Sequence, residues 1–217
     1  ALIGPNGAGK TTFVNLLTGV LRPTSGRVRL MGNDITALSS ETRVRRGMAR
    51  TFQINQLCAT MTPLEMIALV ASERRGLGAR ALHTLDAYDD LVAEVGDILE
   101  RFGLEDVMDS RIATLPYGKQ RQIEIAAAFA AKPSVLLLDE PAAGVPEAER
   151  RELLASVAVL PDDVSVLLIE HDMDLVFRFA TRITVLVNGR VLAEGEPAMV
   201  ARDAAVKAAY LGEADHG

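Results

Sequence analysis

The stretch GPNGAGKTT, residues 4–12, decides the fold of this chain. It fits the pattern G-x-x-x-x-G-K-[ST], in which Gly4, Gly9, Lys10 and Thr11 hold the fixed positions. Glycines let the backbone curl so that successive N–H groups face phosphate oxygens, and a following helix adds the partial positive charge of its N-terminus. Lys10 can reach the β- and γ-phosphates, and the Thr11 hydroxyl can ligate Mg²⁺. We therefore predict a nucleoside triphosphate site made of Gly4, Pro5, Asn6, Gly7, Ala8, Gly9, Lys10, Thr11 and Thr12.

The segments on either side of this loop fit a strand–loop–helix unit. Residues 1–3 read as the end of a strand. After the loop, Phe13, Leu16, Leu17 and Val20 have the spacing of one apolar helix face. The alternative, a glycine-rich turn without a ligand, is disfavoured by this context.

Two adjacent carboxylates follow a second apolar segment, PSVLLLDEP at residues 133–141. Residues 135–138 are continuously apolar, as in a strand that is buried on both faces. Asp139 ends the strand, where ligands bind in open α/β sheets, and suits a direct or water-mediated contact to Mg²⁺. Glu140 can polarise an attacking water, which favours hydrolysis over phosphoryl transfer to a small metabolite. A pair of solvated acids is the alternative.

A histidine follows the third apolar strand, VSVLLIEH at residues 164–171. His171 lies just beyond the strand end, and we expect it at the same edge of the sheet as Asp139 and Glu140. Its predicted role is to hydrogen-bond the γ-phosphate and the attacking water. The alternative is an ordinary surface or packing histidine.

Composition bounds the remaining possibilities. The chain has 217 residues, which suffice for one large domain or a domain with a lobe, and its net charge of −6 disfavours a nucleic-acid partner. No apolar run approaches the roughly 18 residues of a membrane helix. The single cysteine, Cys58, excludes an internal disulfide, and we expect it to be a buried or half-buried apolar residue. The arginines 43, 45, 46 and 50 are expected mainly on a solvated helix face.

The middle of the chain has helical patterns. Thr62 and Glu65 frame a capping box with Pro63 at the first helical position. Further on, one apolar stripe before a C-terminal cap at Gly103 comprises Leu91, Val95, Ile98, Leu99 and Phe102. We predict that residues 57–120 form a helical subdomain inserted into an α/β core of residues 1–56 and 121–217. Near the end of the core, NG at residues 188–189 predicts a hairpin turn.

Taken in order, these motifs resemble those of the ABC-type ATPases, over nearly the whole chain. LPYGKQ, residues 115–120, stands at the signature position, where that family usually has Leu-Ser-Gly-Gly-Gln. Tyr117, the sequence EPAAG after the second strand and AAYLGE near the end resemble the ATPases of branched-chain amino acid importers.

The resemblance implies a P-loop NTPase (RecA-like) α/β core with a mainly parallel sheet and an inserted α-helical subdomain. It implies that ATP and Mg²⁺ bind, with Glu140 and His171 catalytic and the metal held by Thr11, Gln53 and Asp139. Gln53 corresponds to the family's glutamine that joins the core to the helical lobe. The signature residues would contact ATP bound to a second cassette, and they are Leu115, Pro116, Tyr117, Gly118, Lys119 and Gln120.

The implied partners are a second ABC ATPase subunit, identical or different, packed head to tail, membrane permease subunits, and indirectly a solute-binding protein. The implied place is the cytoplasmic face of the inner membrane, as a peripheral protein that powers import of branched-chain amino acids or a related small polar solute. Two alternatives stay open: a soluble ABC-type ATPase, and a weakly hydrolysing cassette that serves as a structural partner.

Three departures from the family pattern stand out. Pro116 replaces the signature serine and removes its hydroxyl donor. Pro146 stands where an Asp or Asn is common. The sequence begins immediately ahead of the P-loop, and we expect it to lack the N-terminal strands of the antiparallel subdomain and the aromatic residue that stacks on adenine.

Overall fold

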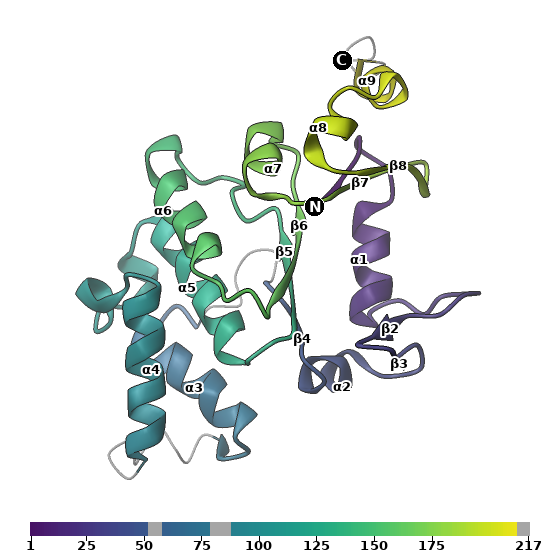
Figure 1. Cartoon of the computed structure of the whole chain (residues 1–217). Coiled ribbons are helices and arrows are strands. Elements are labelled where there is room, and N and C mark those ends of the chain that lie inside the picture. The colour runs from purple at the N-terminus through teal and green to yellow at the C-terminus, as the bar shows by residue number, and fades with distance from the viewer. Residues whose placement is uncertain (52–57, 79–87, 212–217) are drawn as a thin grey trace. The chain divides into compact units, whose positions relative to one another are not determined.

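The computed structural model describes residues 1–51, 58–78 and 88–211, and the chain divides into two compact units (Figure 1). Unit 1 consists of Ala1–Arg46, Leu137–Glu140 and Val166–Gly217. Unit 2 consists of Gly47–Leu136 and Pro141–Ser165. The predicted subdomain boundaries at 56/57 and 120/121 stay a prediction.

A mainly parallel sheet is the centre of unit 1. Its strand order is β5-β6-β1-β7-β8, in which β1 pairs in parallel with β6 and β7, and β7 pairs antiparallel with β8. The bounds are β1 Leu2–Ile3, β5 Val135–Asp139, β6 Ser165–Ile169, β7 Ile183–Val187 and β8 Arg190–Gly195. A separate antiparallel hairpin joins β2 (Arg29–Leu30) to β3 (Asn33–Asp34). The predicted α/β class with a mostly parallel sheet is confirmed.

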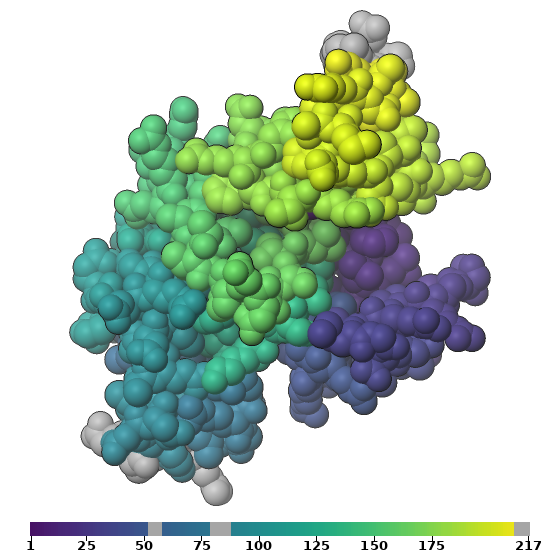
Figure 2. Space-filling model, in the orientation of Figure 1, coloured from purple at the N-terminus to yellow at the C-terminus, as the bar shows by residue number. Residues whose placement is uncertain are grey.

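The helices of unit 1 are α1 Lys10–Thr18, α2 Ser40–Arg45, α7 Met173–Phe179, α8 Pro197–Val200 and α9 Ala204–Leu211. The last two follow β8 and contact it, and their yellow residues are seen at the top of the space-filling view (Figure 2). Val200 of α8 and Val206 of α9 join a buried cluster with Ile183 and Val185 of β7.

Successive residues of β1 face opposite sides of the sheet, as the pleat requires. Leu2 packs with Ala8, Val14, Ile169 and Leu186. Ile3 belongs to the second cluster, which also includes Val176 of α7. Both faces of β1 are therefore buried, which explains its apolar sequence.

The predicted apolar face of α1 is wrong. Val14 is fully buried, whereas Phe13 is 39% exposed and Val20 is 62% exposed, beyond the helix end at Thr18. Neighbouring helix residues differ by about 100° in direction, so Phe13 and Val14 cannot face the same side. Val14 packs against Leu2 of β1, Ile169 of β6 and Leu186 of β7, which leaves Phe13 toward the solvent.

Arg43 was predicted to lie on a solvated face, and this is also wrong. Its side chain is 1% exposed, and its guanidinium donates to the carbonyl oxygens of Leu16, Leu17, Thr36 and Leu38. The last carbonyls of a helix lack intrahelical partners. Arg43 supplies those partners at the C-terminal end of α1.

Unit 2 is mainly helical, with α3 Pro63–Arg74, α4 Asp89–Arg101, α5 Tyr117–Ala130 and α6 Glu147–Ala158. Short 3₁₀ turns lie at Glu105–Val107 and Ile112–Thr114. Strand β4 (Met48–Arg50) lies beside the start of β5, where the N–H groups of Ser134 and Val135 both donate to the Gly47 carbonyl.

The helix signals predicted for this region are confirmed. The Thr62 hydroxyl accepts from the Glu65 N–H, and the Glu65 carboxylate accepts from the Thr62 N–H. The α4 stripe is buried, and Gly103 has a φ of 59° directly after it. Cys58, by contrast, is exposed, contrary to prediction. Within the described ranges, no helix is both long and apolar enough to cross a bilayer.

Candidate active site

The loop between β1 and α1 has a backbone that requires glycine at its first position. A Cβ atom on Gly4 would lie 2.1 Å from the carbonyl oxygen of Leu186, closer than any real contact. Gly7 and Gly9 have φ values of 75° and 98°, in the left-handed region that favours glycine. The Ala8 N–H donates to the Pro5 carbonyl at 3.1 Å and closes the turn.

The hairpin turn of β7 and β8 holds this loop. Asn188 and Gly189 have φ values of 49° and 73°, which suit the tight hairpin turn that the Asn-Gly pair predicts. The Gly189 N–H donates to the Ala8 carbonyl at 2.8 Å. The loop is therefore fixed by a turn that lies 181 residues further along the chain, from Ala8 to Gly189.

The polar groups at the start of α1 suit a phosphate. Lys10 Nζ donates to the carbonyl oxygens of Gly4 at 2.6 Å and Pro5 at 3.1 Å, so its cation lies against the loop backbone. The N-cap of α1 is Gly9, which has no side chain to cap the helix. Thr11 and Thr12 are exposed in its first turn. A cation, hydroxyl groups and helix N–H groups converge here, which is the usual chemistry of a phosphate site.

The end of β5 presents the two predicted carboxylates. Asp139 is the last residue of the strand and is 8% exposed. Glu140 follows with a φ of 47°, a left-handed conformation that costs a non-glycine residue roughly 1–3 kcal/mol. The Glu140 N–H donates to the Ile169 carbonyl at 2.9 Å, which fixes Glu140 against the end of β6.

His171 lies beside Glu140, as the shared sheet edge predicts. Its Nδ1 atom is 3.8 Å from Glu140 Oε1, and its side chain is largely exposed. The His171 N–H donates to Glu170 Oε2 at 3.2 Å, and Glu170 itself is buried. We did not predict Glu170 as a site residue, although a carboxylate at the end of an apolar strand could have indicated one. P-loop, Asp139, Glu140 and His171 all belong to unit 1.

The predicted signature residues lie in unit 2. Pro116 is the N-cap of α5, with no side-chain hydrogen bond, and Tyr117 begins the helix. Gln120 Nε2 donates to the Leu115 carbonyl at 2.9 Å and closes the turn before the helix. Lys119 Nζ donates to the Gly103 carbonyl at 3.1 Å.

The predicted metal ligands can be assessed only in part, because Gln53 lies outside the described residues. Among the described residues, no cluster of three or more His, Cys, Asp and Glu side chains could hold a metal. The Thr11 hydroxyl and the Asp139 carboxylate nevertheless fit Mg²⁺. This ion usually takes one or two protein oxygens and completes its shell with water and substrate phosphates.

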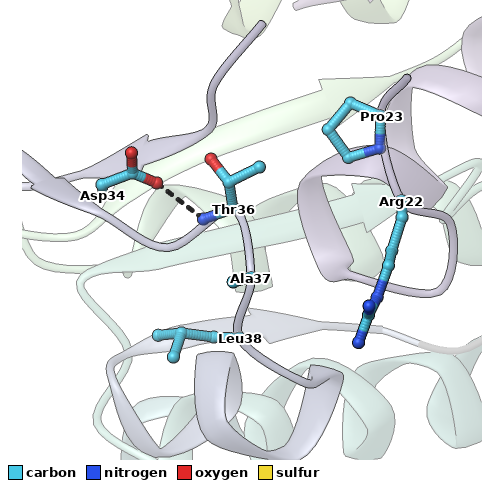
Figure 3. Close-up of a pocket in the computed structure, with 6 residues that line it drawn as sticks. All are labelled: Arg22, Pro23, Asp34, Thr36, Ala37 and Leu38. Carbon is cyan, nitrogen blue, oxygen red and sulfur yellow. Dashed lines mark hydrogen bonds between the residues drawn. The ribbon is translucent and has the colours of Figure 1, made fainter. Parts of the chain in front are cut away.

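A hollow elsewhere in unit 1 does not belong to this site. It measures about 440 Å³ and is lined by Arg22, Pro23, Asp34, Thr36, Ala37 and Leu38 (Figure 3). Asp34 Oδ1 accepts from the Thr36 N–H, and hydrogen bonds to Thr36 hold the pKa of this exposed carboxyl below its ordinary value. The carboxylate is thus engaged in its own turn, and no predicted site residue lines the hollow.

Family models match most of the chain. The ABC transporter model matches residues 1–143, and the branched-chain amino acid ATP-binding cassette transporter model matches residues 190–216.

Relatives match over almost the full length. The chain is 40% identical to the high-affinity branched-chain amino acid transport ATP-binding protein BraF of Pseudomonas aeruginosa, over 99% of this chain and 87% of that protein. It is 40% identical to LivG of Escherichia coli, with the same coverage. A probable LivG of Archaeoglobus fulgidus is 37% identical, over 99% of this chain and 84% of that protein.

Solved structures agree in fold. An ATP-binding cassette of an ABC transporter in its ADP conformation superposes with a TM-score of 0.81 at 31% identity, over 97% of this chain and 86% of that one. A nucleotide-free cassette from an ABC transporter gives 0.79 at 30% identity, over 96% and 86%. Sequence and fold agree with the geometry of the P-loop and of the Glu140–His171 pair, and this chain belongs to the ATP-binding cassette family of ABC transporters.

Proposed function

We propose that this chain binds and hydrolyses ATP as the cassette subunit of an importer of branched-chain amino acids. The observation that carries the chemistry is the pairing of Glu140 and His171, 3.8 Å apart, in the unit that also holds the P-loop. A carboxylate beyond a strand-end Asp, with a histidine beside it, suits activation of a water at a phosphoryl group.

In this proposal the triphosphate occupies the loop of residues 4–12. Lys10 exchanges its bonds to the Gly4 and Pro5 carbonyls for the β- and γ-phosphates, which leaves the cation in the same place with a stronger acceptor. Glu140 accepts the proton of the attacking water, and His171 orients that water and hydrogen-bonds the γ-phosphate. Thr11, Asp139 and Gln53 would hold Mg²⁺, and the bound ion would neutralise phosphate charge.

The substrate and the partners are inferred from the names of the relatives. Proteins 40% identical to this chain are ATP-binding proteins of high-affinity branched-chain amino acid transport. We infer the same solute class, permease subunits in the membrane, and a place on its cytoplasmic face. A second cassette, identical or different, would pair head to tail so that its ATP meets residues 115–120, and a solute-binding protein would deliver the amino acid.

The experiment is uptake by the assembled transporter, with leucine, isoleucine and valine as labelled solutes. Lys10→Ala should abolish uptake of these three and ATP hydrolysis together, because the cation at the phosphates is lost. Arg22→Ala, at the unrelated hollow, is the control and should leave both unchanged. Full uptake with Lys10→Ala would contradict the proposal, and hydrolysis without uptake of branched-chain amino acids would contradict the solute class.

A further inference from the structure

A carboxylate from a neighbouring helix sits on the N-terminus of the signature helix. The Gly118 N–H, in the first turn of α5, donates to Glu149 Oε2 at 2.6 Å. The first N–H groups of a helix have no intrahelical partner, and an N-cap side chain commonly accepts from one of them. Pro116 offers no such acceptor. Glu149, in the first turn of α6, supplies it instead.

The fit between these two residues is close. A Cβ atom on Gly118 would lie 2.6 Å from Glu149 Oε2 and 2.8 Å from Glu149 Cβ. Only glycine leaves room for Glu149 at this position. Gly118 is buried, so its N–H is covered by Glu149 rather than open to solvent.

A second contact joins the same two segments of unit 2. A Cβ atom on Gly144 would lie 3.4 Å from the Tyr117 ring, and Gly144 has a φ of 74°. Tyr117 and Gly118 thus both lie beside residues 144–149. Arg121, which also belongs to α5, has its guanidinium carbon 5.2 Å from the centre of the Tyr117 ring.

We infer that Glu149 positions the signature turn and competes with nucleotide for it. This inference rests on the proposed function, in which the γ-phosphate of ATP bound to the other cassette meets the signature N–H groups. A carboxylate and a phosphate are both anions and accept the same hydrogen bond. Glu149 therefore has to leave Gly118 before the ATP-bound pair of cassettes closes.

The position of Glu149 explains how a signature with proline in place of serine keeps an ordered helix start. The carboxylate caps α5 while ATP is absent, and its negative charge sets the ATP concentration at which the pair closes. Glu149 is a positioning residue, since it acts through the Gly118 N–H.

The test measures the ATP concentration at half-maximal association in the Glu140→Gln background, where hydrolysis is blocked. The full chain is used, alone and mixed with the second cassette subunit of its transporter. Glu149→Gln keeps the shape and an acceptor oxygen but removes the charge, and it should lower this ATP concentration about tenfold, which is ~1.4 kcal/mol. Glu147→Gln removes the same charge from the same helix turn at an exposed position and should leave it unchanged.

A purely structural role gives the opposite pattern. Loss of a cap alone would lower the unfolding midpoint and weaken association, whereas competition predicts stronger association even if the midpoint falls. Glu149→Ala gives a second reading: it should lower the midpoint further than Gln and still strengthen association. Parent-like or weaker association in both Glu149 variants would overturn the inference alone. Absence of ATP-dependent association in the Glu140→Gln parent, with and without the second subunit, would overturn the proposed function and the inference together.

Discussion

Glu140 Oε1 and His171 Nδ1 lie 3.8 Å apart because the N–H of Glu140 is bonded to the carbonyl of Ile169, two residues before His171. Strands β5 and β6 are neighbours in the sheet, and their carboxyl ends carry the two side chains. Backbone pairing at the sheet edge thus brings together two side chains that are 31 residues apart in sequence.

Replacement of His171 tests this pairing. His171→Ala should slow ATP hydrolysis about a hundredfold, in the lower range for loss of a proton-handling or orienting group. ATP binding should weaken only slightly, because the variant loses one hydrogen bond to the γ-phosphate and keeps the loop of residues 4–12. The unfolding midpoint should stay unchanged, because the side chain is largely exposed. His171→Gln retains a hydrogen-bond donor and should recover part of the rate. Equal rates for wild type and His171→Ala would remove the histidine from the mechanism.

The P-loop backbone gives a prediction on stability. Gly4→Ala places a methyl group against the Leu186 carbonyl oxygen, so the loop or β7 must move, and the free energy of unfolding should fall by more than about 3 kcal/mol. Gly7→Ala is the matched control in the same loop, since nothing lies within 4 Å of its Cβ position. Only the left-handed backbone opposes it, at a cost of roughly 1–2 kcal/mol. Denaturant titration measures both variants, and equal losses would refute the steric account.

The free energy of unfolding at acidic pH depends on Glu94 in α4. Burial raises the pKa of its carboxyl, but hydrogen bonds from Arg75 and Lys132 and the charge of Arg74 lower it by more, so the pKa lies below its ordinary value. The folded chain then binds fewer protons than the unfolded chain just below pH ~4.3, the usual pKa of a glutamate. The stabilisation that Glu94 provides is present above pH ~4.3 and is lost as the pH falls through the pKa of Glu94 in the folded chain.

Glu94→Gln should therefore cost about 1–2 kcal/mol at pH 7, and the difference from wild type should shrink as the pH falls below ~4.3. Asp97→Asn removes a charge from an exposed position of the same helix and should change little. Urea denaturation at a series of pH values measures both. A Glu94→Gln deficit that is constant from pH 7 to pH 3 would show that the ion pairs do not stabilise the fold.

Much of this molecule follows from local patterns. The start of α3 after Thr62, the hairpin at Asn188 and the carboxylates at the end of β5 were predicted because each depends on neighbours within a few residues. To predict that Glu140 and His171 lie side by side, we also had to assume that parallel strands have their carboxyl ends at the same edge of the sheet.

The failures have a common cause in tertiary contacts. The spacing of apolar residues in α1 did not distinguish Phe13 from Val14, because the rotation of the helix is fixed by strands distant in sequence. The burial of Arg43 depends on carbonyls 26 and 27 residues away, and the bond from Gly118 to Glu149 spans 31 residues. No short motif records these contacts.

The central claim is that Glu140 activates the water that attacks ATP at this site. The most direct measurement is ATP hydrolysis by the full chain with Glu140→Gln, together with nucleotide binding and particle mass in the same samples. Gln keeps the size of the side chain but cannot accept the proton, so the account predicts turnover at or below ~1% of wild type with ATP still bound and the cassette pair trapped. Wild-type turnover by Glu140→Gln would contradict it.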